Sequence, residues 1–457
     1  MTSTLQRFVN VRRGEIPVLL ASAFFFFCVL SALMVVRPAR EALGMQSGLE
    51  AVRWLFVGTA VVTLSVNPVF GWLVAKFRRI YFIAATYLFF GASLLVFWAL
   101  LAFAPDATGE VTGRVFYVWF SVFNLFSTMV FWALMVDRFT LEQSKRLFGV
   151  VAVGGTLGAM FGPWLAWTYV DTIGTATLIL LAVGFLGLAV VSAAVVAHLR
   201  PKGSGPEDPG APDHDFTDRE KEIIGGSAWE GFRAVVRSRY LLGICAFVLI
   251  MAIMATFIYF TRLQMVAEMT GVMDEQTGLF AQIDFWTQFT TFLLQLLVTG
   301  HIMKRLGVAV ALVLLPVTVA LGFLGLAITG TFVALIVLEA AYRAIQRGIT
   351  RPARETLFTV VGREDKYKSK ALVDTFVYRT GDVTGAWTEG LLGALGGGLA
   401  MLTGLVVPLA GAWAGLAVWL GRKQTEIALE QEEVAGRPSG DGPQDPDPTV
   451  AATAYEE

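Results

Sequence analysis

Twelve apolar stretches, each long enough to cross a lipid bilayer, dominate this sequence. A membrane-spanning helix needs about 20 mostly apolar residues, and backbone polar groups in lipid must pair within their own helix. The composition agrees, because 56% of the 457 residues are hydrophobic and 16% are charged. We therefore expect an all-α membrane protein with twelve transmembrane helices. The stretches lie near 16–36, 52–75, 80–103, 115–136, 147–170, 174–197, 240–260, 277–299, 307–328, 331–347, 371–394 and 397–420.

The loops between these stretches differ in charge, which predicts the orientation of the chain. Cytoplasmic loops of membrane proteins are enriched in Lys and Arg. With the N-terminus in the cytoplasm, most basic residues fall on the cytoplasmic side, and the outer side holds only Arg37, Arg40, Arg53, Arg114 and Arg262. We expect a multi-pass protein of the plasma (inner) membrane with both termini in the cytoplasm.

The chain also divides in two. A central loop at 199–239 separates an N-terminal half, 1–198, from a C-terminal half, 240–422. Lys145 opens the fifth stretch as Lys370 opens the eleventh, which predicts two pseudo-symmetric six-helix halves. Parallel repeats of this kind flank a midplane binding site in many transporters.

Two segments outside the spans carry their own signals. Ser227 and Glu230 fit a capping box, and apolar residues such as Phe232 then recur at helical spacing. We expect a short amphipathic helix there, on the cytoplasmic surface. The segment 423–457 is acidic and rich in Pro and Gly towards its end, a composition typical of a disordered cytoplasmic tail.

Ionisable residues inside the apolar stretches are the strongest functional signal, because they are costly in lipid and mark transport pathways. Asp284 has no charged partner on its own helix, so it must meet one from another helix or titrate. It is our candidate for proton coupling. Glu339 with Arg343, and Arg379 with Asp382, are spaced to pair along one helix face.

Arginine is the side chain that best matches a carboxylate or phosphate, because its guanidinium is planar and forked. We therefore predict a site that binds an anion through arginines and is coupled or gated by acids. Structural roles remain open: Glu339 and Arg343 could only fasten their helix, and Asp374 could be a contact at its cytoplasmic end. The predicted substrate-binding residues are Arg37, Arg40, Arg262, Arg343 and Arg379, and the predicted coupling or gating residues are Asp284, Glu339, Asp374 and Asp382.

Two further patterns are interpreted as having no chemical role. The pentapeptide Arg-Pro-Ala-Arg-Glu occurs at 37–41 and at 351–355. The spacing of the copies does not match the spacing of the halves, so we interpret the repeat as a coincidence. Gly154, Gly155 and Gly158 predict close helix packing rather than a phosphate-binding loop, because no GK[ST] follows them.

The six-plus-six layout, with short basic loops after the second and eighth helices, resembles the major facilitator superfamily. Three stretches more narrowly resemble its nucleotide-exchange (ATP/ADP translocase) branch and the bacterial relatives of that branch: Arg37 to Gly44, Gln143 to Phe148, and Lys368 to Asp382. This resemblance implies that Arg37 and Arg40 contact an anionic substrate.

These patterns favour a secondary active transporter of a small organic anion, with nucleotides and other phosphorylated metabolites as candidates, working by alternating access. The alternative is a non-transporting membrane sensor or assembly partner that retains the transporter fold. An enzyme is not expected, and neither is a cofactor or a metal, because metal-ligand spacings, a nucleophile elbow and a nucleotide-binding loop are absent from the sequence.

The expected partners follow from the same reasoning. They are the lipid bilayer, a small anionic substrate, and protons as the candidate coupling ion. The net charge of −1 gives no reason to expect nucleic acid, and we expect a monomer.

Overall fold

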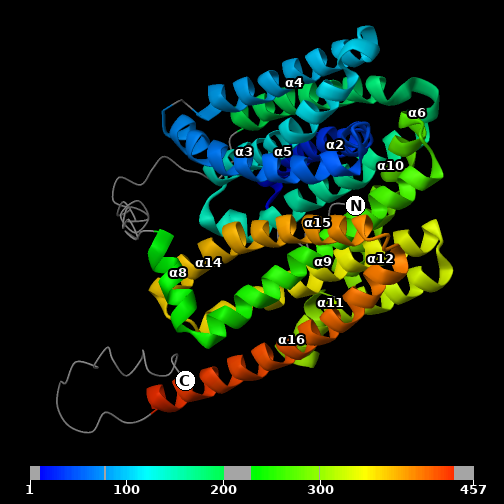
Figure 1. Ribbon diagram of the computed structural model, residues 1–457. Coiled ribbons are helices and arrows are strands. Elements are labelled where there is room, and N and C mark those ends of the chain that lie inside the picture. The colour runs from blue at the N-terminus through cyan, green and yellow to red at the C-terminus, as the bar shows by residue number, and fades with distance from the viewer. Residues whose placement is uncertain (1–10, 77–78, 200–227, 298, 437–457) are drawn as a thin grey trace. The chain divides into compact units, whose positions relative to one another are not determined.

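The computed structural model describes residues 11–76, 79–199, 228–297 and 299–436 (Figure 1). Every regular element in these ranges is a helix, which confirms the all-α fold class. The first part of the chain forms η1 (Arg13–Glu15), α2 (Ile16–Met45), α3 (Gly48–Lys76), α4 (Arg79–Phe103), α5 (Pro105–Arg138) and α6 (Leu141–His198). The later part forms α8 (Ala228–Arg237), α9 (Arg239–Met269), α10 (Met273–Leu297), α11 (Thr299–Thr329), α12 (Phe332–Ile345), η2 (Gln346–Thr350), α13 (Arg351–Leu357), η3 (Phe358–Val360), α14 (Arg363–Leu372), η4 (Val373–Val377), α15 (Tyr378–Ala394) and α16 (Leu399–Gly436).

Each of the twelve expected spans lies mainly on helical segments where the structure describes the chain. Within the described ranges, eight helices are long and apolar enough to cross a membrane. One of them, α6, contains both the fifth and the sixth expected span. Gly174 separates the two with a φ of 77°, a left-handed conformation that glycine adopts without steric cost. The chain is therefore a multi-pass membrane protein.

Several helices extend beyond the expected spans. The region from Arg347 to Lys370, expected as a basic cytoplasmic loop, is mostly helical, because α12 continues through the π-helical turn η2 into α13 and is followed by α14. Helix α16 continues to Gly436, so the described part of the expected disordered tail, 423–436, is helical instead. Lys, Gln, Glu and Ala, which are good helix formers, dominate it, and Gln431 Nε2 donates to Val360 O at 3.0 Å.

The chain forms two compact units. Unit 1 comprises Met1–Asp213 with Leu263–Phe289, and unit 2 comprises His214–Arg262 with Thr290–Glu457. Helices α9 and α10 therefore each contribute to both units. Each unit has its own apolar interior and its own set of buried charges.

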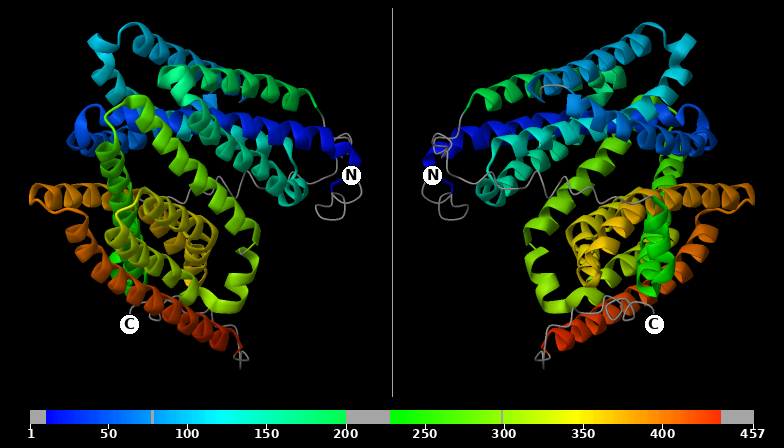
Figure 2. Two further views of the ribbon diagram at one scale, coloured as in Figure 1. Left: turned by 90° about the vertical axis from the view of Figure 1, so that its right-hand side faces the viewer. Right: turned by 90° about the vertical axis from the view of Figure 1, so that its left-hand side faces the viewer.

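Unit 1 is built around α2, which packs against α5 and α6 (Figure 2). The glycines of α6 allow the close approach that the sequence predicts, since a Cβ on Gly154 would lie 2.2 Å from Ala23 O and one on Gly158 would lie 2.3 Å from Phe27 O. The phenylalanine run of α2 also contributes to the interior, where the rings of Phe26 and Phe131 stack at 4.1 Å.

Unit 2 is built around α11, which packs against α16 and α12. Trp413 of α16 is fully buried, and its ring lies 5.3 Å from that of Phe247 on α9. The amphipathic helix α8 packs against α14, as Figure 1 shows. This arrangement holds the two π-helical turns, η2 and η4, at the positions where they line one cavity.

Candidate functional site

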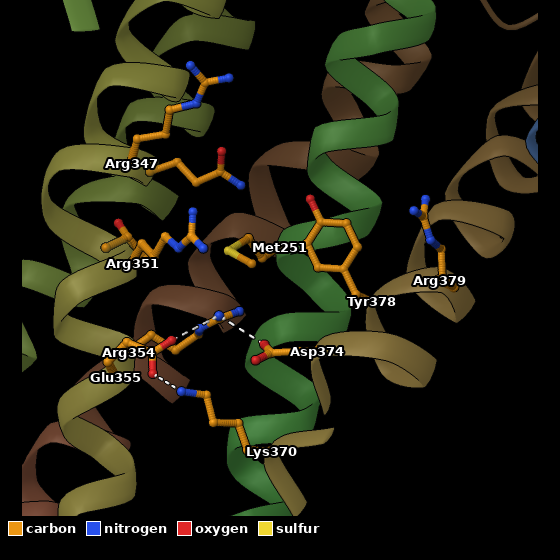
Figure 3. A pocket seen from close by; sticks show the side chains of 11 residues that line it. Met251, Arg347, Arg351, Arg354, Glu355, Lys370, Asp374, Tyr378 and Arg379 are labelled. Atoms are coloured by element: carbon orange, nitrogen blue, oxygen red, sulfur yellow. Dashed lines mark hydrogen bonds and ion pairs between the residues drawn. The ribbon is translucent and has the colours of Figure 1, made fainter. Parts of the chain in front are cut away.

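A cavity of about 550 Å³ lies inside unit 2 (Figure 3). Its walls come from three segments: α9, the rod formed by η2 and α13, and the rod formed by α14, η4 and α15. Five lining side chains are basic and two are acidic. The lining residues are Met251, Gln346, Arg347, Thr350, Arg351, Arg354, Glu355, Lys370, Asp374, Tyr378 and Arg379.

Both rods change from α-helical to π-helical geometry beside this cavity. The π-helical turn η2 supplies Gln346, Arg347 and Thr350, and η4 supplies Asp374. A π-helical turn is rare and occurs frequently at functional sites, because the extra residue in the turn reorients the side chains around it. The two turns thus mark the cavity independently of its charge.

Ion pairs join the two rods across the cavity. Arg354 Nη2 lies 2.9 Å from Asp374 Oδ1 and 3.4 Å from Glu355 Oε1, and Lys370 Nζ also pairs with Glu355 (Figure 3). Burial raises the pKa of Glu355, but the hydrogen bond and charge of Lys370 and the charge of Arg354 outweigh it, so the pKa lies below the usual value. Glu355 is therefore an anion at neutral pH and holds both cations in place.

Some donor groups of the residues that line the cavity lack a partner among the described residues. Thr350 is fully buried, and within the described part of the chain its Oγ1 has no hydrogen-bond partner. The same holds for Nε of Arg354, a residue that is 8% exposed. Arg351 is exposed at the cavity wall and forms no ion pair with any described residue. A buried donor without a partner is costly, so these groups are suited to an anionic or polar ligand.

A second charged cluster in unit 2 lies deeper in the helices. Glu339 Oε1 accepts from Arg262 Nη1 at 3.0 Å and from Arg343 Nη2 at 2.8 Å. Arg262 was expected at the outer end of its helix, but α9 continues to Met269 and the side chain of Arg262 is completely buried. None of these three residues lines the cavity.

Of the predicted pair on α15, Arg379 and Asp382, only Arg379 lines the cavity. Arg379 Nη1 lies 3.2 Å from Asp382 Oδ2. The neighbouring Tyr378 also lines the cavity, as does Gln346 of η2. Both rods therefore supply polar groups at this level of the cavity.

Unit 1 holds the remaining predicted residues. Arg37 Nε lies 3.6 Å from Asp284 Oδ2, and the Asp284 side chain is 1% exposed. Asp284 thus meets a cation from another helix, one of the two outcomes that the sequence allowed. Arg40 Nη1 lies 3.0 Å from Glu41 Oε1, and its guanidinium carbon is 3.8 Å from the centroid of the Tyr117 ring.

Sequence reasoning found only part of the cavity. Asp374 and Arg379 were predicted, but Arg347, Arg351 and Arg354 had been assigned to a loop. The signal that could have revealed them is the repeated Arg-Pro-Ala-Arg-Glu, since its second copy, 351–355, supplies three lining residues. The spacing of the two copies and their expected positions on opposite membrane faces had both favoured coincidence, and neither argument concerns the cavity.

Comparisons with known proteins agree with this architecture. The sequence profile of the Major Facilitator Superfamily matches residues 19–352. No curated protein sequence matches the chain. The solved structure of a bacterial homologue of the human lysosomal transporter Spinster, inward-facing and unoccupied, is 15% identical and has a TM-score of 0.51, covering 98% of this chain and 97% of that one. The nucleoside transporter NupG is 12% identical with a TM-score of 0.51, covering 91% of this chain and 100% of that one. At these identities the likeness shows a shared fold.

Proposed function

Because the chain belongs to the Major Facilitator Superfamily, we propose that it is a secondary transporter whose substrate is a small organic anion. The family and the transporter folds that resemble the chain indicate a membrane transporter rather than an enzyme. Alternating access would carry the substrate between the two sides of the bilayer. The family does not specify the substrate, so the proposal of an organic anion rests on the residues of this chain.

The single observation that carries the proposal is the charge of the unit 2 cavity. Five basic side chains line it and only two carboxylates do, Glu355 and Asp374. Asp382 compensates Arg379 from outside the lining. A cavity with this excess of positive charge attracts anions and repels cations. The lining therefore carries more basic than acidic side chains, which favours an anionic ligand.

Among small organic anions, a phosphate monoester fits the donors of the cavity well. It carries a charge of about −1.5 to −2 at neutral pH and three strong acceptor oxygens. Thr350, Arg351 and Arg354 supply donors for those oxygens, since all three residues line the same cavity. The volume of about 550 Å³ lies within the range of roughly 300–1,000 Å³ for small-molecule sites. Nucleotides and sugar phosphates are therefore the first substrates to test.

The test compares two isosteric esters, phenyl phosphate and phenyl sulfate, as ligands of the purified protein. A ligand that binds the native state raises the melting temperature. We expect the phosphate ester to stabilise more at pH 7.5 and to lose this advantage as pH falls through about 6, where phosphate takes up its second proton. The sulfate ester, a monoanion throughout, should show no such change.

The matched variants are Arg351→Gln, which removes a cavity charge, and Arg422→Gln, which removes an exposed charge of α16. Arg351→Gln should weaken phosphate-ester binding by about tenfold, or about 1.4 kcal/mol, and Arg422→Gln should leave it unchanged. The proposal fails if both variants bind like the parent, or if neutral solutes alone stabilise the protein and enter vesicles. A ligand that binds but is never taken up would instead favour the non-transporting sensor.

Proton coupling is the second part of the proposal, with Asp284 as the acceptor. The support is its burial in unit 1 and its contact of 3.6 Å with Arg37, because protonating a carboxylate that pairs with an arginine releases the arginine. Such a change can bias a two-state equilibrium between the conformations of a transporter. The event to be tested is the protonation of Asp284 together with the loss of its ion pair with Arg37.

A further inference from the structure

Helix α8 meets the membrane-spanning helix α9 at a tight corner. α8 ends at Arg237, α9 begins at Arg239, and only Ser238 separates them. Ser238 Oγ accepts from Leu241 N at 3.4 Å and so caps the start of α9. Because α9 is apolar enough to span the bilayer from Arg239 onward, this corner places α8 at the level where the chain enters the membrane.

One side of α8 is fixed to the elements that build the cavity. Val235 is 4% exposed, and α8 packs against α14. Just beyond the corner, Tyr240 is buried and its hydroxyl donates to Leu357 O, at the end of α13, at 2.9 Å. α8 therefore has a defined inner side, and its outer side faces away from the protein.

The outer side of α8 combines apolar and basic residues. Phe232 and Val236 are each 53% exposed, and Arg233, Arg237 and Arg239 are exposed beside them. Exposed apolar side chains flanked by arginines are typical of a helix that lies in a membrane interface.

We propose that α8 docks onto the anionic surface of the cytoplasmic leaflet. Phe232 and Val236 enter the boundary between headgroups and acyl chains, and Arg233, Arg237 and Arg239 pair with lipid phosphates. A lipid surface is the occupant because the helix is joined by a single residue to a span and presents cations to a leaflet that carries negative charge. A protein partner would have no such reason to lie at this depth.

Docking has a consequence for the cavity. α8 packs against α14, which carries Lys370, the cavity residue that pairs with Glu355. Anionic lipid would therefore hold α14 in the position that keeps Lys370 at the cavity wall. The docking itself does not depend on the proposed substrate, so the two proposals can fail separately.

The experiment uses the full chain with Cys28→Ala and Cys245→Ala, carrying a nitroxide label at Phe232→Cys. The detergent-solubilised protein is titrated with dioleoyl-phosphatidylglycerol or with dioleoyl-phosphatidylcholine. We expect phosphatidylglycerol to shield the label from a water-soluble nickel chelate and expose it to oxygen, at a lower lipid fraction than phosphatidylcholine. If the labelled variant does not fold, the label is placed at Val236→Cys instead.

Two double variants complete the experiment. Each arginine near an anionic surface contributes about a five-fold factor in affinity, so Arg233→Gln with Arg237→Gln should weaken the response to phosphatidylglycerol by about 25-fold. Arg422→Gln with Lys423→Gln removes the same charge from α16 and should leave the response unchanged. Equal responses to the two lipids, or no effect of the α8 arginines, would overturn the proposal. So would a label that is shielded from both the nickel chelate and oxygen before any lipid is added, because exclusion of both agents points to a protein contact.

Discussion

Arg354 of α13 reaches Asp374 of η4 at 2.9 Å, inside the cavity that both residues line. The carboxylate of Asp374 occupies one face of a guanidinium whose Nε has no partner within the described residues. An anionic ligand would thus compete with Asp374 for the same arginine. The contact between Arg354 and Asp374 should therefore affect how tightly the cavity binds an anion.

Replacing Asp374 by Asn should strengthen the binding of a phosphate ester, because Arg354 then loses its 2.9 Å carboxylate partner and keeps only the longer contact of 3.4 Å with Glu355. We expect a gain of about tenfold, equivalent to about 1.4 kcal/mol, measured by titration calorimetry. Asp365→Asn makes the same change at an exposed position of α14 outside the cavity lining and should have no effect. Weaker binding in Asp374→Asn than in Asp365→Asn would show that Asp374 positions Arg354 rather than competing for it.

The buried cluster of Arg262, Glu339 and Arg343 should be essential for stability. Glu339→Gln leaves two arginines without their carboxylate, and breaking a buried pair costs about 3–5 kcal/mol. We expect a large fall in the melting temperature of the purified protein. Glu268→Gln, at an exposed position of α9, is the control and should change stability by less than about 1 kcal/mol. Similar melting temperatures for the two variants would contradict the burial of this cluster.

Glu15 should make stability depend on pH. Burial raises the pKa of Glu15, but hydrogen bonds from Arg12 N, Arg146 and Gln143 together outweigh this effect. The folded-state pKa therefore lies below the usual value. A carboxyl of this kind stabilises the fold above its unfolded pKa and loses that contribution as pH falls through the folded pKa. The difference in melting temperature between the parent and Glu15→Gln should shrink as pH drops below about 4.5. A difference that does not change with pH would contradict the contacts of Glu15 with Arg146 and Gln143.

The ion pair between Arg37 and Asp284 provides the test of proton coupling. Asp284→Asn should retain substrate binding and lose pH-dependent uptake in vesicles, because the amide cannot titrate. The control variant is Glu110→Gln, which removes an exposed carboxylate of α5 that pairs with Arg114. Uptake by this variant should keep its pH dependence. Uptake by Asp284→Asn that still follows an imposed pH gradient would assign the coupling to another group.

The contact between α2 and α6 predicts opposite effects of two similar substitutions. Gly154→Ala places a Cβ 2.2 Å from Ala23 O, so the helices must separate, whereas a Cβ on Gly149 meets nothing within 4 Å. We expect Gly154→Ala to destabilise the protein by about 1–3 kcal/mol and Gly149→Ala to stabilise it by up to about 1 kcal/mol through helix propensity. Thermal unfolding in detergent measures both, and equal effects would argue against the tight packing.

The sequence by itself determined the helices. Hydrophobicity acts residue by residue along the chain, so the spans were predictable, as was the close packing at Gly154 and Gly158. The pairs of Glu339 with Arg343 and of Arg379 with Asp382 were also predictable, because helix geometry sets their spacing. The extension of α16 to Gly436 was missed, since Pro and Gly near the end of the chain dominated our interpretation of the tail.

Only the tertiary structure decided which charges meet. Arg262 reaches Glu339 across 77 positions of sequence, and Arg354 reaches Asp374 between two helical rods. The π-helical turns that direct Thr350 and Asp374 into the cavity also depend on how these rods pack. An ion pair depends on the distance between two groups in space, and the order of residues along the chain does not contain that distance. For this reason the sequence predicted arginines as the chemistry of the site, and the packed helices of unit 2 selected Arg347, Arg351 and Arg354 among them.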